Sequence, residues 1–296
     1  MITILDGGMG AELIRRGSAS RDELWSAQAL LDAPNDVIQT HLDFIQAGAR
    51  IITTNSYSCV PSYLGKAGLA GEYQRLAALA GKLARDAVSQ TTFPVLVAGS
   101  LPPLQESYRA DLVPENNEAR GIYGNIADAL EPYIDLFICE TMSSSRETKN
   151  AAIEAKKAAQ SRELPVYVSW TLNEKPGLGL RSGESIKEAF VAINDLKVDG
   201  YLCNCSSPEA IEAGVEQLSL LTTKPIGGYP NRFVGVPDGW TLDNGKDVGR
   251  REDLDPIVFA QIARRCIEKG ATIFGGCCGV GPEHIAAISN EINTPP

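Results

Sequence analysis

The 296-residue sequence lacks clustered positive charge and long apolar runs. Lys and Arg number 27 against 37 Asp and Glu, which gives a formal net charge of −10. Nucleic acids and anionic membranes are bound mainly through clustered positive charge, so we expect neither as a partner. No run approaches the roughly 18 apolar residues of a membrane-spanning helix. The first residues, MITILDGG, lack the basic segment and the apolar stretch of a secretory signal, which predicts a cytoplasmic protein.

Paired cysteine motifs are also missing. The sequence has seven cysteines, an odd number, and no Cys-x-x-Cys pair. They are Cys59, Cys139, Cys203, Cys205, Cys266, Cys277 and Cys278. An odd count without an export signal argues against a disulfide framework and favours a reducing compartment.

What the sequence does contain is an alternation of short apolar runs and longer helical stretches. The apolar, β-branched runs cover 2–5, 50–54, 94–99, 135–139, 165–170, 200–204, 224–228 and 271–276. The candidate helices cover 34–48, 69–90, 115–131, 145–160, 184–195, 207–219, 255–269 and 282–291. Apolar strands separated by helices indicate a parallel sheet covered on both faces. Eight such units predict one (β/α)8 barrel domain over residues 1–296, with an open doubly wound sheet as the alternative.

Polar and thiol-bearing residues follow the predicted strands at their C-terminal ends, where barrel enzymes carry their active sites. These residues are Asp6, Gly7, Asn55, Ser56, Tyr57, Glu140, Cys205, Cys277 and Cys278. The longest irregular stretches, 100–114 and 229–254, also follow strands, and we expect them to shape the mouth of a binding site.

The adjacent pair Cys277-Cys278, inside GGCCG, allows three interpretations. Core packing is one, because free cysteine behaves as a small buried hydrophobe. A vicinal disulfide is strained, because adjacent Cα atoms lie ~3.8 Å apart and disulfides usually need ~4.4–6.8 Å. Metal binding is the third, because the flanking glycines let both thiolates turn toward one point. With Cys205 from another strand, three thiolates and one open position would match a catalytic zinc site.

The sequence resembles the zinc-dependent homocysteine S-methyltransferase family over nearly its whole length. The matching segments are ILDGGMGAEL (4–13), LWSAQALLDAP (24–34), AGARIITTNSY (47–57), ETMSSSRE (140–147), NCSSPEAI (204–211), GGYPN (227–231) and GGCCGVGPEHI (275–285). The resemblance implies a (β/α)8 barrel with one Zn²⁺ per chain, held by Cys205, Cys277 and Cys278. Cys203 lies outside the pattern; on a strand it would share the face of Cys205, which leaves it open as a substitute ligand.

The resemblance also implies roles for residues at the mouth. Asp6 and Glu140, with Gly7, are expected near the ammonium group of homocysteine, and Asn55 and Ser56 are expected to orient a substrate. The predicted donor-side residues are Trp25, Tyr57, Tyr229 and Asn231, whose aromatic members could contact a cation. We interpret His41 as structural, whereas His284 could either support the metal ligands or cap a helix.

The predicted reaction is methyl transfer from a small onium donor to the thiolate of L-homocysteine, giving methionine. Zinc would deprotonate the thiol. S-methylmethionine or S-adenosylmethionine is favoured over betaine as the donor, and a selenol acceptor stays open. The alternatives of other classes are a non-enzymatic zinc or redox-sensing thiol module and another barrel enzyme. Against the last, the sequence has neither a phosphate-binding loop near its end nor a conspicuous strand lysine.

Overall fold

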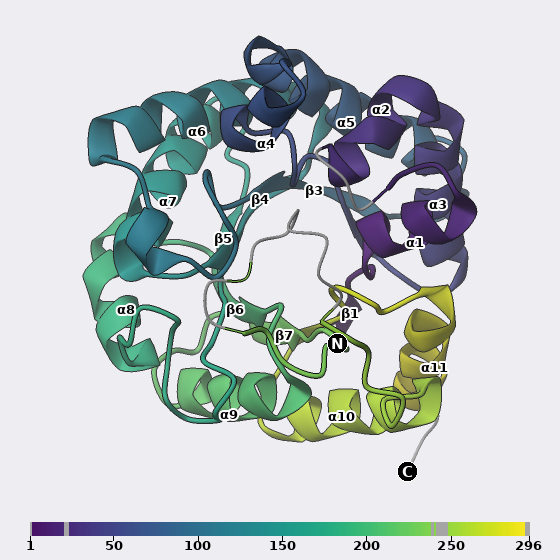
Figure 1. The fold of residues 1–296 in the computed structure, drawn as a ribbon. Coiled ribbons are helices and arrows are strands. Elements are labelled where there is room, and N and C mark those ends of the chain that lie inside the picture. The colour runs from purple at the N-terminus through teal and green to yellow at the C-terminus, as the bar shows by residue number, and fades with distance from the viewer. Residues whose placement is uncertain (1, 21–23, 238–239, 241–247, 294–296) are drawn as a thin grey trace.

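The fold is a parallel β-barrel surrounded by helices (Figure 1). The structure is a computed structural model that describes residues 2–20, 24–237, 240 and 248–293. Its strands are β1 (Thr3–Ile4), β2 (Ile51–Thr53), β3 (Leu96–Leu101), β4 (Leu136–Met142), β5 (Val166–Trp170), β6 (Gly200–Asn204), β7 (Ile226–Tyr229) and β8 (Ile273–Phe274). Each pairs in parallel with its neighbour in the order β1-β8-β7-β6-β5-β4-β3-β2. A parallel bridge between Leu5 and Ile51 joins β1 to β2 and completes the barrel.

The eight predicted strands are therefore confirmed, and the closed barrel replaces the open-sheet alternative. The predicted helices correspond to α3 (Pro34–Gln46), α5 (Tyr73–Val88), α6 (Asn116–Leu130), α7 (Ser145–Ala159), α8 (Ile186–Ile193), α9 (Pro208–Ser219), α10 (Pro256–Glu268) and α11 (Pro282–Asn293). Three short helices were not predicted: α1 (Met9–Arg16), α2 (Gln28–Asp32) and α4 (Pro61–Lys66). In the part of the chain that the structure describes, no helix has the length and hydropathy of a membrane span.

The apolar side chains form two separate layers. Residues that alternate along the strands pack inside the barrel: Leu5, Ile51, Ala98, Leu136, Ile138, Leu202, Tyr229 and Ile273. A larger cluster fills the space between the strands and the outer helices. This arrangement follows from strand geometry, because successive side chains point to opposite faces of a sheet. The interior is thus packed, and the thiol-bearing segments lie at the strand ends.

Two helix starts fix the segments that carry the cysteines. The side chain of Ser207 accepts a hydrogen bond from Ala210 N at the start of α9, and Pro208 occupies the first turn. Helix α11 begins at Pro282, four residues after Cys278. Caps of this kind stabilise a helix start by about 1 kcal/mol. The strand–turn–helix segments after β6 and β8 therefore hold Cys205 and the Cys277-Cys278 pair at the same end of the barrel.

Candidate functional site

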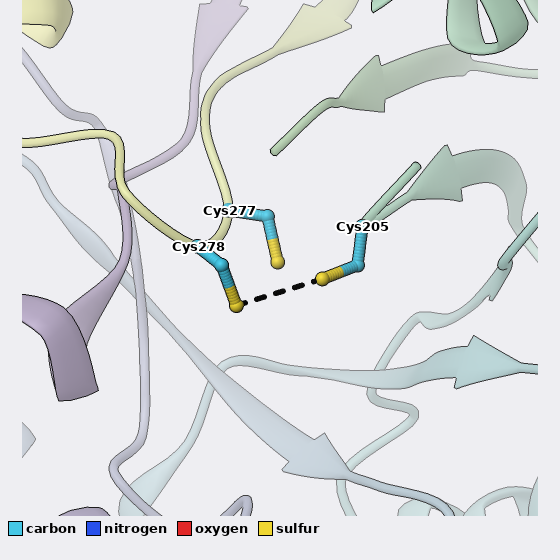
Figure 2. Close-up of side chains that lie close together, drawn as sticks. All are labelled: Cys205, Cys277 and Cys278. Atoms are coloured by element: carbon cyan, nitrogen blue, oxygen red, sulfur yellow. Dashed lines mark hydrogen bonds between the residues drawn. The ribbon is translucent and has the colours of Figure 1, made fainter. Parts of the chain in front are cut away.

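Three thiols converge at the C-terminal ends of β6 and β8. Cys205 directly follows β6, and Cys277 and Cys278 follow β8. Their Sγ atoms all lie within 4.8 Å of one another, and the Sγ atoms of Cys205 and Cys278 are 3.6 Å apart. Figure 2 shows the two segments approaching from opposite sides with the three sulfur atoms turned toward one another. Among the described residues, this group can hold a metal ion through three soft sulfur ligands.

Backbone conformation brings these side chains together. Cys205 has φ +49, a left-handed conformation that L-residues rarely adopt outside functional or turn positions. Gly279, with φ +79, reverses the chain directly after the cysteine pair. The close approach of the segment between β1 and α1 also requires a glycine, since a Cβ at Gly8 would lie 2.7 Å from the carbonyl oxygen of Cys277.

Among the three thiols, Cys205 loses its proton most readily. Hydrogen bonds from the thiols of Cys277 and Cys278 lower the pKa of Cys205 well below its usual value, and the phenol of Tyr108 adds to the effect. The same contact with Cys205 raises the pKa of each of the other two thiols. The cluster thus stabilises a thiolate at Cys205 before any cation binds. A divalent cation would favour loss of the proton from the other two thiols, so the cluster is well matched to such an ion.

Two buried carboxyl groups lie beside the thiols. Asp6, after β1, accepts hydrogen bonds from the backbone N (2.7 Å) and the Oγ1 (3.0 Å) of Thr53. Glu140, within β4, accepts hydrogen bonds from Ser100 Oγ and, at 3.3 Å, from Tyr229 Oη. Burial raises the pKa of each carboxyl group to about 7, against the opposing effect of these hydrogen bonds. Such groups are poised to ionise when a ligand supplies a positive charge.

The thiols and carboxyl groups face one cavity of about 770 Å³, including the solvent at its opening. Most of the residues predicted for the site line it: Asp6, Gly7, Trp25, Asn55, Tyr57, Glu140, Cys205, Tyr229, Cys277 and Cys278. The rings of Trp25 and Tyr57 meet edge to face, with centroids 6.3 Å apart. The cavity therefore combines a sulfur cluster, two carboxyl groups and an aromatic wall.

Tyr108 was not predicted, although it lies in the 100–114 loop that was expected at the mouth. Its Oη is 3.0 Å from Cys205 Sγ. Its ring contacts Trp240, at 5.8 Å between centroids, and Arg181, whose guanidinium carbon lies 5.0 Å from the ring centroid. Its φ of +69 is again left-handed. A tyrosine in a loop carries no periodicity, so only its place in a long loop after a strand could have indicated it.

Four predicted residues use their polar atoms in contacts within the protein. Asn55 lines the cavity, but its amide donates to the carbonyl of Ser26, 3.0 Å away. Ser56 is not among the lining residues; its hydroxyl donates to Ser100 O at 3.0 Å. Asn231 is also outside the lining, and its Oδ1 accepts from Phe233 N at 3.1 Å. Tyr229, which was expected on the donor side, lines the cavity and donates to Glu140 at 3.3 Å.

The remaining cysteine and histidine candidates lie away from the thiols. Cys203 was expected to share the face of Cys205, and this was wrong. Its Sγ packs toward Gly214 in α9 because the left-handed residue Cys205 ends the strand alternation. His41 is fully buried, and burial lowers its pKa to about 3. His284 Nδ1 accepts from Gly281 N at 3.3 Å and lies 3.2 Å from Glu283 Oε1, so these contacts are local to the start of α11. Part of the predicted mouth loop over 229–254, at 238–239 and 241–247, lies outside the described residues.

Comparison with known proteins gives one consistent family. The sequence profile described as Homocysteine S-methyltransferase matches residues 3–292. The chain is 29% identical to Homocysteine S-methyltransferase 3 of Arabidopsis thaliana, covering 99% of this chain and 90% of the relative. It is also 29% identical to the Selenocysteine Se-methyltransferase of Brassica oleracea var. italica, covering 98% and 88%.

A solved structure agrees in fold and extent. The homocysteine methyltransferase MmuM from Escherichia coli, in its metallated form, superposes with a TM-score of 0.81 at 27% identity, covering 98% of this chain and 96% of that one. The profile match spans nearly every residue, including all three clustered cysteines. The chain belongs to the homocysteine S-methyltransferase family.

Proposed function

We propose that this protein transfers a methyl group from a small onium donor to the sulfur of L-homocysteine, giving methionine. The observation that carries the proposal is the convergence of three thiols and two buried carboxyl groups on one cavity. In the reaction, the bond between the methyl carbon and the onium centre breaks and a carbon–sulfur bond forms. The donor leaves as a neutral thioether or amine, and the acceptor thiol loses its proton.

The three clustered cysteines fit a single Zn²⁺ ion as ligands. They supply three sulfur atoms, the number typical of a catalytic zinc site, and no further His, Cys, Asp or Glu joins the cluster within the described chain. When bound, the zinc ion would lower the pKa of the acceptor thiol so that the thiolate is available at neutral pH. Cys205 already favours the thiolate form, so of the three ligands it needs the smallest change in protonation to bind the ion.

Asp6 and Glu140 are proposed to bind the ammonium group of homocysteine. Both are buried beside the thiols, and an ammonium group would convert two neutral carboxyl groups into a charge-assisted hydrogen-bonding pair. Tyr229, which donates to Glu140, would orient that carboxylate, so we assign it to the acceptor side. Gly7 allows the close approach of Val280, whose carbonyl oxygen would lie 2.4 Å from a Cβ at this position. Asn55 and Ser56 hold the ends of neighbouring segments through Ser26 and Ser100.

Trp25 and Tyr57 are proposed to bind the cationic donor. Their rings form the apolar part of the cavity, and the face of an aromatic ring attracts an onium group. Asn231 supports this side only indirectly, through the backbone of Phe233. Methyl transfer needs no protein nucleophile; these side chains contribute by aligning the donor with the sulfur and by excluding water.

A selenol acceptor is the second candidate. The relative from Brassica oleracea named Selenocysteine Se-methyltransferase favours it, and the same site would accept the heavier atom. Competition between homocysteine and selenocysteine at equal concentration distinguishes the two acceptors by the product formed.

The test is a donor panel with homocysteine and reduced, zinc-supplied protein, read by methionine formation. We expect about one zinc per chain, methionine from at least one onium donor, and loss of both in Cys277→Ser. Cys203→Ser is the matched control, because it removes a buried thiol that packs against α9 and should change neither. Full zinc and full activity in Cys277→Ser would refute the metal assignment. Zinc binding without product from any donor or acceptor would favour the non-enzymatic thiol module.

A further inference from the structure

One buried amide, that of Asn204, links the strand ends that carry Glu140 and Cys205. Asn204 is the last residue of β6 and is fully buried. It does not line the thiol cavity, the cavity that the three clustered cysteines and the two carboxyl groups face. Its Oδ1 accepts from the backbone N of Thr141 at 2.9 Å and from Ser169 Oγ at 2.7 Å, and its Nδ2 donates to Thr141 Oγ1 at 2.8 Å. The amide therefore joins the ends of β4, β5 and β6.

On β4, this contact lies at an irregularity in the strand pairing. The register shifts between Cys139 and Met142, where β4 advances by three residues while β5 advances by two, as in a β-bulge. Thr141 in this stretch has φ +58, a rare conformation for a β-branched residue. Its backbone N donates to the side chain of Asn204. Because bulges change the direction of side chains, the contact with Asn204 stabilises the local backbone that directs Glu140 into the cavity.

On β6, the same amide lies next to one of the clustered thiols. Cys205 follows Asn204 with φ +49, so the chain leaves the strand conformation at this point. The two side chains have contacts in different directions: the amide bonds to β4, whereas the thiol lies 3.6 Å from the Sγ of Cys278. Anchoring Asn204 to β4 and β5 therefore fixes the point from which the thiol of Cys205 projects.

We propose that Asn204 is a positioning residue, which holds the carboxyl group of Glu140 and the thiol of Cys205 at a fixed separation. The inference rests on the proposed function, in which homocysteine places its ammonium group at Glu140 and its sulfur beside Cys205. A substrate that contacts two places at once gains the full affinity of both only when their separation matches its own length. Removal of the amide would leave the buried N of Thr141 without its acceptor, so the strand ends would shift.

The test is Asn204→Ala with two acceptors that differ only in the ammonium group. Homocysteine carries this group, whereas 4-mercaptobutanoate has the same thiol and carboxylate without it. Calorimetry on reduced, zinc-supplied protein measures the binding of each acceptor. We expect the unmodified protein to prefer homocysteine and Asn204→Ala to lose about tenfold of that preference. Asn150→Ala is the matched control and should keep the preference, because this buried amide of α7 bonds to Asn116 and Arg120 on α6.

A double-mutant cycle separates positioning from a general loss of structure. If Asn204 acts through Glu140, Asn204→Ala should add less than about twofold to the preference already lost in Glu140→Gln. Thr141→Val is a milder second variant, since it replaces the hydroxyl that accepts from Asn204 by a methyl group. We expect it to lose about threefold of the preference, and Thr141→Ser, which keeps a hydroxyl, to retain it.

The readout is binding, so it holds even if no donor yields methionine, and failure of the methyl transfer is a separate result. An unchanged preference in Asn204→Ala and Thr141→Val, an equal weakening of both acceptors, or additive losses in the double variant would each overturn the positioning role. Failure of the unmodified protein to bind homocysteine would refute the proposed function, and the positioning role with it.

Discussion

Replacing Tyr108 by Phe isolates a single hydrogen bond to the thiol cluster. The Oη of Tyr108 lies 3.0 Å from Cys205 Sγ, and Cys205 is the thiol whose pKa is lowered, so the phenol donates and the sulfur accepts. The ring itself is held by Arg181 and Trp240, which the substitution leaves in place. The change therefore removes one donor with little change in packing.

The expected loss of zinc affinity follows from the charge on the sulfur of Cys205, which accepts the hydrogen bond. A hydrogen bond to a charged group contributes about 1.5–3 kcal/mol. A bound metal withdraws part of the charge from the sulfur, so we take the lower end, about 1.5 kcal/mol, which corresponds to roughly a tenfold change in a dissociation constant. We expect Tyr108→Phe to weaken zinc binding by about that factor.

Competition with a chromophoric chelator under reducing conditions measures this change directly. Tyr57→Phe is the matched control, because Tyr57 lines the same cavity and its hydroxyl bonds to Ser107 at 2.7 Å instead of to a thiol. Its zinc affinity should equal that of the unmodified protein. If Tyr108→Phe also binds zinc within twofold of the unmodified protein, the phenol does not support Cys205 and the reasoning fails.

Two further predictions concern the carboxyl groups and the backbone at β1. Burial raises the pKa of Asp6 and Glu140 to about 7, so both carboxyl groups are largely protonated below that pH and cannot pair with an ammonium group. KM for homocysteine should therefore rise as the pH falls below about 7. In initial-rate profiles, Glu140→Gln should weaken this pH dependence. In Gly8→Ala the new Cβ would lie 2.7 Å from the carbonyl oxygen of Cys277, so zinc affinity should drop by about tenfold. Gly121→Ala, whose Cβ meets nothing within 4 Å, should leave it unchanged. A flat KM profile between pH 6 and 8, or normal zinc binding in Gly8→Ala, would contradict the respective argument.

The strands and long helices were predictable because each carries a repeated physical signal. Apolar runs such as 135–139 and 165–170 fill the strands of a sheet buried on both faces, and they recur as β4 and β5. The short helices α2 and α4 span five and six residues, too few turns to establish a periodicity, and they were missed for that reason. Helix α1, which begins two residues after Gly7, was missed although it is as long as α8.

Side-chain direction at the site was less predictable than residue identity. The alternation rule placed Cys203 and Cys205 on one face, and it failed because Cys205 leaves the strand with a positive φ. The same rule says nothing about Asn55 and Ser56, of which only Asn55 lines the cavity. A local sequence pattern determines which residues arrive at the strand ends, whereas the backbone conformation of single residues determines which of them face the ligand.

The distribution of unusual backbone conformations links these observations to function. Outside glycine, positive φ values occur in the described chain at six residues, and three of them, Trp25, Tyr108 and Cys205, line the thiol cavity. Each such residue costs of order 1–3 kcal/mol, which packing elsewhere must offset. A barrel with two extensive apolar layers can sustain that cost, and the left-handed residues let an aromatic ring, a phenol and a thiol turn into one space from three different segments. Relieving the strain, for example by a glycine at any of the three, should therefore stabilise the local backbone while loosening the arrangement that the chemistry requires.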